Sequence, residues 1–301
     1  MNNILEVKNV VKQYGDYTAL NSVSLNVPQG SIYGLLGPNG AGKTSLIRII
    51  NQITLPDSGE IWLDGERLNP NHVAIIGYMP EERGLYKTMK VGEQCLYLAQ
   101  LKGMSKAEAK AQLKYWFEKF EIQGWWDKKI QELSKGMAQK VQFIVTVLHK
   151  PKLLILDEPT SGLDPLMQEK FFELLISVKK QGSTVFFSSH NIAEVQRVSD
   201  RVGFIKDGEL IGIEEVSKLR GLDVHQLKVR FGEKVSKKSF ENIEGIEQFN
   251  LSGIEGWFEV RGSVDPFIKE LARHNVVSIE RQETALEDIF MKYYQSTKGE
   301  S

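Results

Sequence analysis

Two short stretches of this 301-residue chain combine glycines, a lysine and carboxylates at spacings that suit phosphate chemistry. The first, GPNGAGKT at residues 37–44, matches the pattern G-x-x-x-x-G-K-[ST] in full. Its glycines let backbone N–H groups face phosphates at the start of a helix, Lys43 meets the outer phosphates, and the Thr44 hydroxyl is a candidate magnesium ligand. The alternative is a glycine-rich turn that carries a lysine by chance. The predicted phosphate contacts are Gly37, Pro38, Asn39, Gly40, Ala41, Gly42, Lys43, Thr44 and Ser45.

The second stretch is KLLILDEPT, residues 152–160, where an apolar run ends abruptly in two carboxylates. Four apolar residues suit a strand buried on both faces of a parallel sheet. Such a strand delivers its terminal acids to the carboxyl edge, where ligands of open α/β sheets bind. Asp157 is therefore a candidate magnesium ligand, and Glu158 is a candidate for orienting an attacking water. The alternative is a solvated acidic loop.

The elements around the phosphate loop give the pattern its context. Short apolar or alternating runs predict strands at residues 4–10, 22–27 and 31–36. After Thr44, apolar residues follow the helical spacing i, i+3, i+4, i+7 at Leu46, Ile49, Ile50 and Ile53. The loop thus lies between a predicted strand and a predicted helix, which is the setting that this motif requires.

Composition narrows the setting further. The length suits about two domains, and 38 Lys and Arg against 39 Asp and Glu give no basic footprint for nucleic acid. The single cysteine, Cys95, excludes an internal disulfide, and we expect it to pack as an apolar side chain. The first residues lack a secretory signal, and no apolar run reaches the ~18 residues of a membrane span, so we expect any membrane role to act through a partner.

The order of four motifs resembles the ATP-binding subunits of ABC transporters. These motifs are the phosphate loop, LLILDEP, SGLD at residues 161–164, and SSH ending at His190; the match runs from about residue 4 to residue 215. The resemblance implies an α/β fold, a P-loop NTPase ABC cassette with an antiparallel β-subdomain and a helical subdomain. It also implies catalytic roles for Glu158, His190 and Lys43, with His190 at the γ-phosphate, and communication across a dimer by Asp164.

The same resemblance assigns adenine stacking to Tyr14, in VVKQYG. The alternative for Tyr14 is an aromatic side chain packed at a strand end. For His190 the alternative is a structural histidine, although its place after TVFFSS puts it at the same sheet edge as Asp157.

The stretch ELSKGMAQK departs from the family signature Leu-Ser-Gly-Gly-Gln. Leu133, Ser134 and Gly136 match, whereas Lys135 and Met137 differ. The resemblance implies that this segment touches the ATP held by the opposite subunit. Ser134 and Gly136 keep a hydroxyl and free N–H groups at a helix start, so we expect them to bind nucleotide. The alternative is an ordinary serine N-cap.

A second departure lies in IGYMPEERGLY, where the family has glutamine at the position of Glu81. The resemblance makes this position a magnesium ligand, and glutamate retains an oxygen donor, so the predicted metal ligands are Thr44, Glu81 and Asp157. The alternative is a solvated loop acid.

Residues from about 88 to 131 read as a helical insert, and the predicted helical subdomain spans about 88–150. Ser105 to Glu108 forms a capping box, and Leu113, Trp116, Phe117 and Phe120 share one face of the helix that follows. In the family this subdomain receives a helix of the membrane protein. The alternative for the aromatic stripe, and for Trp125 and Trp126, is core packing.

The tail from residue 216 predicts a small C-terminal α+β domain, beyond a hairpin that turns at Asp207–Gly208. Strands are expected at HQLKVRF, GWFEVRG and VVSIERQE, with helices at VDPFIKELARHN and from TALE onward. TALEDIFMKYY resembles the accessory domain of daunorubicin-exporter and sodium-exporter ATPases. The predicted domains are therefore 1–215, which binds ATP, and 216–301.

Together these features predict the ATPase subunit of an export-type ABC transporter. It uses ATP and Mg²⁺, forms a head-to-tail dimer, and has two membrane-spanning permease subunits and no nucleic acid as partners. We expect it to be cytoplasmic, held at the inner face of the membrane by its permease. One alternative is a nucleotide-gated regulatory module with little turnover, suggested by Glu81, Lys135 and Met137. Another is a non-transport ABC ATPase, although only 88 residues separate Thr44 from Leu133 and no long coiled coil fits there.

Overall fold

The computed structural model describes residues 2–82, 84–216 and 224–282. The chain divides into two compact units, Met1–Ile213 and Glu214–Ser301, and each is described by itself. The helix expected from TALE onward lies outside the described residues.

The first unit begins with a four-stranded antiparallel sheet. Its order is β2-β1-β4-β5, formed by β1 (Asn3–Tyr14), β2 (Tyr17–Pro28), β4 (Ser58–Leu63) and β5 (Glu66–Arg67). Leu5, Val7 and Val10 of β1 are buried, while polar residues between them face outward, as the alternation predicts. The antiparallel β-subdomain expected from the sequence is confirmed.

A six-stranded sheet forms the centre of this unit, with the order β10-β9-β3-β8-β7-β6. Its strands are β3 (Ile32–Leu36), β6 (Ile76–Met79), β7 (Leu153–Asp157), β8 (Thr184–Ser189), β9 (Arg201–Lys206) and β10 (Glu209–Glu215). The neighbours from β6 to β9 pair in parallel, and every residue of β3, β7 and β8 is buried. The apolar runs of these strands suit burial on both faces. The hairpin turn predicted at Asp207–Gly208 is present, with left-handed φ angles of 49° and 80°.

Helix α1 (Lys43–Ile50) lies between the two sheets, and its apolar face joins both in one core. The helical face predicted for Leu46, Ile49 and Ile50 is confirmed, because all three lie on this helix and are buried. The prediction that Ile53 lies on the same helical face is wrong. The helix ends at its C-cap Asn51, Gln52 turns the chain with a φ of 57°, and Ile53 is 57% exposed.

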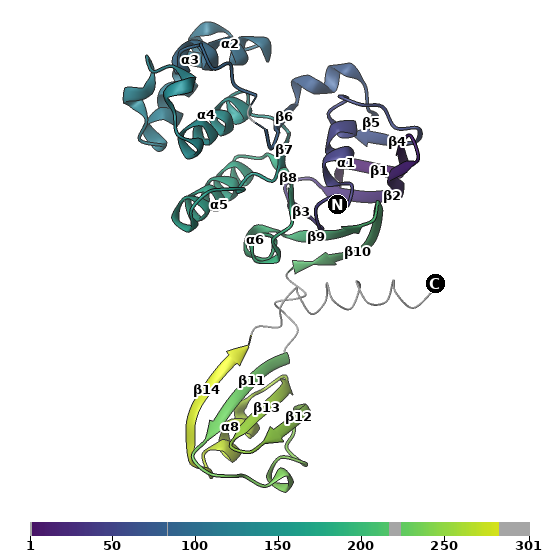
Figure 1. Cartoon of the computed structure of the whole chain (residues 1–301), viewed down its shortest axis with the longest axis vertical. Coiled ribbons are helices and arrows are strands. Elements are labelled where there is room, and N and C mark those ends of the chain that lie inside the picture. Colours follow the sequence, from purple (N-terminus) through teal and green to yellow (C-terminus); the bar gives the residue numbers. More distant parts are fainter. Residues whose placement is uncertain (1, 83, 217–223, 283–301) are drawn as a thin grey trace. The chain divides into compact units, whose positions relative to one another are not determined.

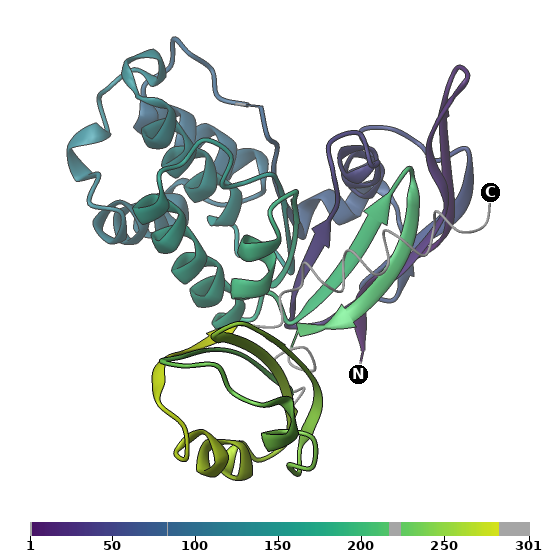
Figure 2. The ribbon, with the colours of Figure 1, turned by 60° about the horizontal axis from the view of Figure 1, so that its bottom comes forward.

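Helices α2 (Val91–Leu101), α3 (Lys106–Lys119) and α4 (Lys135–Val147) form the helical part of this unit, at the end away from the antiparallel sheet (Figure 1). Figure 2 shows these teal helices and the purple strands on opposite sides of the central strands. The capping box of Ser105 and Glu108 is present. Trp116 packs against Phe120 and Phe143, so the predicted aromatic stripe is core. Cys95 of α2 is fully buried, and burial raises its pKa to about 12.

Two further helices, α5 (Pro165–Lys180) and α6 (Ile192–Val198), follow β7 and β8 and pack against β8. The chain therefore leaves each of these strands through a loop at the carboxyl edge and returns in a helix, as parallel sheets require. No helix in the described part of the chain is long and apolar enough to cross a membrane.

The second unit is a four-stranded antiparallel sheet with one helix, so the predicted C-terminal α+β fold is confirmed for the residues described. Its order is β12-β13-β11-β14, formed by β11 (Val224–Phe231), β12 (Ile246–Ser252), β13 (Glu255–Arg261) and β14 (Val276–Gln282), with α8 (Asp265–Leu271). Phe240 packs against Phe258 and Phe267 in its core. Strand β12 was not predicted from the sequence, because polar residues interrupt its apolar pattern.

Candidate functional site

The phosphate loop follows β3 and ends where α1 begins. A Cβ at Gly37 would clash with the carbonyl of Ile205, and a Cβ at Gly42 would lie 2.9 Å from Leu20 Cδ2. Gly42 also adopts a φ of 102°, a conformation that residues with a side chain rarely reach. Both positions therefore require glycine for reasons of space, and at Gly42 also of backbone conformation.

Lys43 lies inside the curl of this loop. Its side chain is almost completely buried, and Nζ donates hydrogen bonds to the carbonyls of Gly37 at 2.7 Å and Pro38 at 3.1 Å. These contacts hold the ammonium in the centre of the loop. A buried cation in a glycine-rich loop at the start of a helix is a binding site for a polyanion.

The two acids predicted at the end of β7 are both buried, Asp157 with only 1% of its surface exposed. Ser188 of the neighbouring strand β8 connects them. Its hydroxyl donates to Asp157 Oδ1 at 2.6 Å and accepts from the backbone N–H of Glu158 at 3.0 Å. Glu158 has a φ of 47°, in the left-handed region that costs a residue with a side chain free energy. The serine thus fixes the turn at which the strand ends and the carboxylate of Glu158 enters the site.

The Glu158 carboxylate is shared between two partners. Oε1 lies 3.2 Å from Lys43 Nζ, an ion pair without hydrogen-bond geometry, and Oε2 lies 2.8 Å from Nδ1 of His190. The three residues predicted to be catalytic therefore meet at one point, although 115 positions separate Lys43 from Glu158. The geometry suits a carboxylate that orients water beside a phosphate.

These residues line a cavity of about 430 Å³, which we call the phosphate cavity. Its walls are Tyr17, Ala19, Asn39, Gly40, Ala41, Gly42, Lys43, Thr44, Ser45, Glu81, Glu158, Ser161 and His190. Gly37 and Pro38 do not line the cavity, but their carbonyls accept the hydrogen bonds from Lys43. Three predicted nucleotide contacts, Tyr14, Ser134 and Gly136, do not line it.

Tyr17 was missed by the sequence analysis. It lines the phosphate cavity, and its hydroxyl donates to the carbonyl of Gly40 at 2.8 Å. Tyr14 lies three residues earlier and is exposed, with Lys12 Nζ 5.4 Å from the centre of its ring. The alternative of a packed aromatic at the strand end does not describe Tyr14, because its ring is open to solvent. A tyrosine three residues from a predicted one carries no distinguishing signal in a single sequence.

A smaller cavity of about 140 Å³ adjoins the same acids, and we call it the acid cavity. Four carboxylates line it, those of Glu81, Glu82, Asp157 and Glu158. Glu81 and Glu158 belong to both cavities, and Glu81 is also exposed, as the alternative of a solvated loop acid expects. Burial and the negative charge of Asp157 raise the pKa of Tyr78 to about 12.

The predicted metal ligands present oxygen atoms of the kind that Mg²⁺ prefers. Thr44 and Glu81 line the phosphate cavity, whereas Asp157 lines the acid cavity, which Glu81 and Glu158 share with it. Within the described residues no three His, Cys, Asp or Glu side chains form a metal cluster by themselves. The donor set therefore fits an ion that takes part of its coordination from phosphate oxygens.

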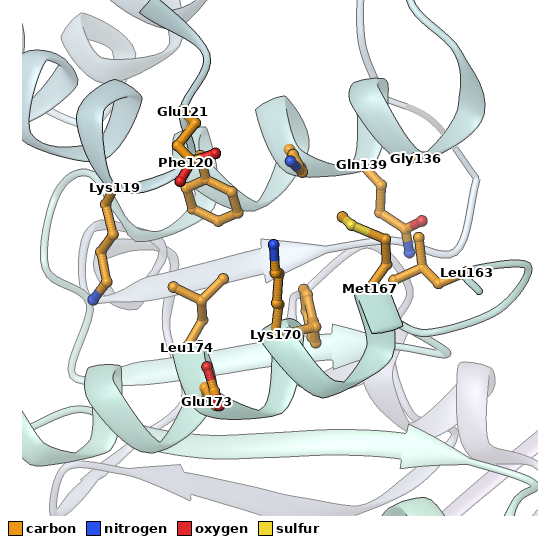
Figure 3. Close-up of a pocket in the computed structure, with 12 residues that line it drawn as sticks. Lys119, Phe120, Glu121, Gly136, Gln139, Leu163, Met167, Lys170, Glu173 and Leu174 are labelled. Atoms are coloured by element: carbon orange, nitrogen blue, oxygen red, sulfur yellow. The ribbon is translucent and has the colours of Figure 1, made fainter. Parts of the chain in front are cut away.

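Ser134 is the N-cap of α4, since its hydroxyl accepts a hydrogen bond from Met137 N at 3.3 Å. Ser134 thus caps the helix and remains exposed, so the cap does not exclude the predicted nucleotide contact. Gly136 faces a separate cavity of about 280 Å³ together with Gln139 and Leu163 (Figure 3). The helix start lies beside the loop that follows Glu158.

A groove of about 410 Å³ lies beside β6 and the helical part, and we call it the helical groove. Its walls are largely apolar, and Ile53 and Leu101 at its rim are 57% and 64% exposed. His149 lines it and contacts the carbonyl of Ile76 through Nε2 at 3.1 Å. Burial, followed by the charge of Lys102, lowers the pKa of His149 to about 4.

Comparison with known proteins agrees with this geometry. Residues 20–161 match the family model described as ABC transporter. An uncharacterized ABC transporter ATP-binding protein of Bacillus subtilis (strain 168) is 38% identical, covering 96% of this chain and 98% of that protein. The bacitracin transport ATP-binding protein of Enterococcus faecalis is 32% identical, covering 97% and 96%. A solved dimeric structure of a bacterial ABC transporter cassette superposes with a TM-score of 0.65 at 27% identity, covering 70% of this chain and 98% of that chain.

Proposed function

Since this chain belongs to the ATP-binding subunits of ABC transporters and is an ATPase, we propose that it drives export through two separate permease subunits. The observation that carries the proposal is the meeting of Lys43, Glu158 and His190 at the wall of the phosphate cavity. ATP occupies that cavity, with its outer phosphates at Lys43. The export direction is supported by the bacitracin transport relative, whose similarity runs through both units of this chain.

Hydrolysis proceeds by in-line attack of a water on the γ-phosphate. Glu158 orients and polarises the water, His190 holds the carboxylate through Nδ1 and contacts the γ-phosphate, and Lys43 stabilises the charge that develops on the phosphate. Thr44, Glu81 and Asp157 would hold Mg²⁺, which neutralises phosphate charge when bound. Tyr14 stacks on adenine beyond the rim of the cavity.

Two chains act as a head-to-tail dimer. Each ATP then lies between residues 37–44 of one chain and Ser134 to Gly136 of the other. The support is that Ser134 and Gly136 are a helix start outside the phosphate cavity of their own chain, so their N–H groups are available to a second chain. Asp164 caps α5 by accepting a hydrogen bond from Met167 N at 2.9 Å. It lies at the end of the loop between β7 and α5 and communicates across the dimer.

The helical groove is the docking site for the permease. Its exposed apolar rim suits the apolar face of a short helix, and Glu81 lies on the loop that leaves the same strand, β6. Residues 1–215 form the ATP-binding domain, with the helical subdomain at about 88–150, and residues 216–301 form an accessory domain. The protein is cytoplasmic and peripheral, held at the inner face of the membrane by this contact.

The test is reconstitution of the chain with candidate permease subunits from the same organism. We expect ATP-dependent efflux, and turnover several-fold above that of the isolated chain because the permease raises the effective concentration of the two halves. Lys43→Ala should abolish both activities because it removes the contacts to the outer phosphates. Full activity of Lys43→Ala, or equal turnover with and without the permease, would refute the proposal.

A further inference from the structure

Lys135, the first residue of α4, reaches the loop that follows the catalytic glutamate of its own chain. A Cβ on Gly162 would clash with Lys135 Nζ and would lie 3.0 Å from its Cε. The lysine side chain therefore packs directly on the backbone of Gly162. Gly162 also has a φ of 73°, so its backbone conformation favours glycine at the point where the lysine packs.

Lys135 also lines the acid cavity. Among the residues lining that cavity it is the one cation, and it faces four carboxylates, Glu81, Glu82, Asp157 and Glu158. The described residues give it no ion pair within 4.0 Å, so the ammonium is close to these acids without being bound to one of them. Lys135, Glu81 and Glu82 are exposed, so solvent screens the attraction among them, whereas the buried Asp157 and Glu158 are screened less.

Two more contacts join the start of α4 to the same loop. Gln139 donates a hydrogen bond to the carbonyl of Pro159. On the opposite side, Leu163 Cδ2 lies 3.8 Å from the Cβ position of Gly136, and Figure 3 shows Gly136, Gln139 and Leu163 together. The helix start thus contacts the loop at three positions, Pro159, Gly162 and Leu163. A displacement of one reaches the other through packed atoms.

We propose that Lys135 is a positioning residue that couples the two ATP sites of the dimer. This inference rests on the proposed head-to-tail dimer, in which the start of α4 faces the ATP of the partner. The partner's phosphates attract the ammonium of Lys135, and the lysine then shifts the loop at Gly162 and loses its hold on its own acid cavity. Each site thereby senses the nucleotide of the other through one side chain.

The test is ATP-driven dimerisation of full-length chains that carry Glu158→Gln, measured by analytical ultracentrifugation over an ATP titration. Three further variants are added to this background, and ATP affinity is measured at chain concentrations too low for dimers. Lys135→Met keeps the length of the stem and removes the charge. Lys135→Arg keeps the charge. Lys140→Met is the matched control, because Lys140 lies on the same helix and faces the cavity in Figure 3 instead.

We expect Lys135→Met to lower the Hill coefficient of dimerisation from about 2 to about 1 and to raise the half-saturating ATP concentration about fivefold or more. ATP affinity of the single chain should not change, which separates positioning from a damaged site. Lys135→Arg and Lys140→Met should behave as the parent. If Lys135→Met dimerises as the parent does, or Lys135→Arg is equally defective, the inference is overturned while the dimer stands. If the parent fails to dimerise with ATP, the dimer and the inference both fall.

Discussion

Lys43 Nζ lies 3.2 Å from Glu158 Oε1, so the lysine expected to bind phosphate is paired with the carboxylate expected to direct water. Both side chains are at least 90% buried, and removing one partner would leave a buried charge without compensation. ATP entering the phosphate cavity must therefore compete with Glu158 for Lys43. We therefore expect the ion pair to lower the affinity for ATP and to hold the carboxylate in place before ATP binds.

The first prediction follows from this competition. Glu158→Gln should bind ATP about tenfold more tightly, since a contact to a charged group contributes ~1.5–3 kcal/mol. Its turnover should fall about 100-fold or more because the general base is lost. Equilibrium binding of a fluorescent ATP analogue and a phosphate-release assay measure the two effects.

A substitution at the neighbouring Asp157 should have a different effect from Glu158→Gln. Asp157→Asn should weaken Mg²⁺-dependent ATP binding, because a hard cation prefers a charged oxygen, and should not dimerise with ATP. Glu173→Gln, on the exposed face of α5, is the control. Normal turnover of Glu158→Gln would show that another group acts as the catalytic carboxylate.

The second prediction concerns Ser188. Ser188→Ala removes the hydroxyl that joins Asp157 to the backbone of Glu158, so both acids lose their fixed orientation. We expect turnover to fall about 10- to 100-fold, as for other residues that hydrogen-bond to a metal-ligating side chain and fix its orientation. Ser183→Ala removes a buried serine hydroxyl just before the opposite end of β8 and should keep full turnover. Equal losses in both variants would mean that Ser188 acts only on stability.

The third prediction separates two tyrosines. Tyr14→Ala should weaken ATP binding about tenfold, since a base stacked on an aromatic ring contributes ~1–3 kcal/mol. It should leave binding of inorganic triphosphate unchanged. Tyr17→Phe should weaken both ligands about equally because the hydroxyl bond to Gly40 shapes the phosphate loop itself. Calorimetric titration of both ligands is the measurement, and loss of ATP binding alone in Tyr17→Ala would assign the base to Tyr17.

The fourth prediction tests the helical groove. Leu101→Glu places a charge on its apolar rim, and we expect permease binding to fall about tenfold or more, because docking would bury this charge against an apolar helix face. ATP binding by the isolated chain should not change. The control is Ile268→Glu, at an exposed apolar position of α8 in the second unit. Affinity is measured with the permease in detergent, and an undiminished affinity would exclude the groove as the docking site.

The fifth prediction concerns acid stability. The pKa of His149 is lowered from 6.5 to about 4, so the unfolded chain takes up a proton in this interval while the folded chain does not. Stability is therefore present above pH 6.5 and decreases as the pH falls toward 4, by ~2 kcal/mol. Urea denaturation at several pH values measures it. His149→Gln keeps a donor for the carbonyl of Ile76 and should flatten this dependence, whereas an unchanged slope would point to another group.

The sequence predicted the parts of the site that are contiguous in the chain. The phosphate loop, the acids after β7 and the histidine after β8 each stand at the end of an apolar run, and parallel strands place such ends at one edge. Contacts between remote residues were not predictable. Tyr17 and Gly40 are 23 positions apart, and Ser188 and Asp157 are 31, so only the register of the folded sheet brings them together.

The error at Ile53 has a different origin. Helical spacing identifies the face of a helix but does not show where the helix ends, because the spacing continues by chance into the next turn. Asn51 follows the last helical residue and marks this end, but Gln52, and not a glycine, takes the left-handed conformation after it. Because the helix ends before Ile53, this residue forms part of the rim of the helical groove.

The burial of Cys95 makes the chain convenient for optical work. It is the sole thiol of the sequence, it is inaccessible, and its raised pKa keeps it protonated at neutral pH. A cysteine introduced at an exposed position such as Tyr86 would thus react alone with a maleimide dye, without a cysteine-free background. Donor and acceptor dyes on two such chains would report the approach of the subunits during turnover in real time.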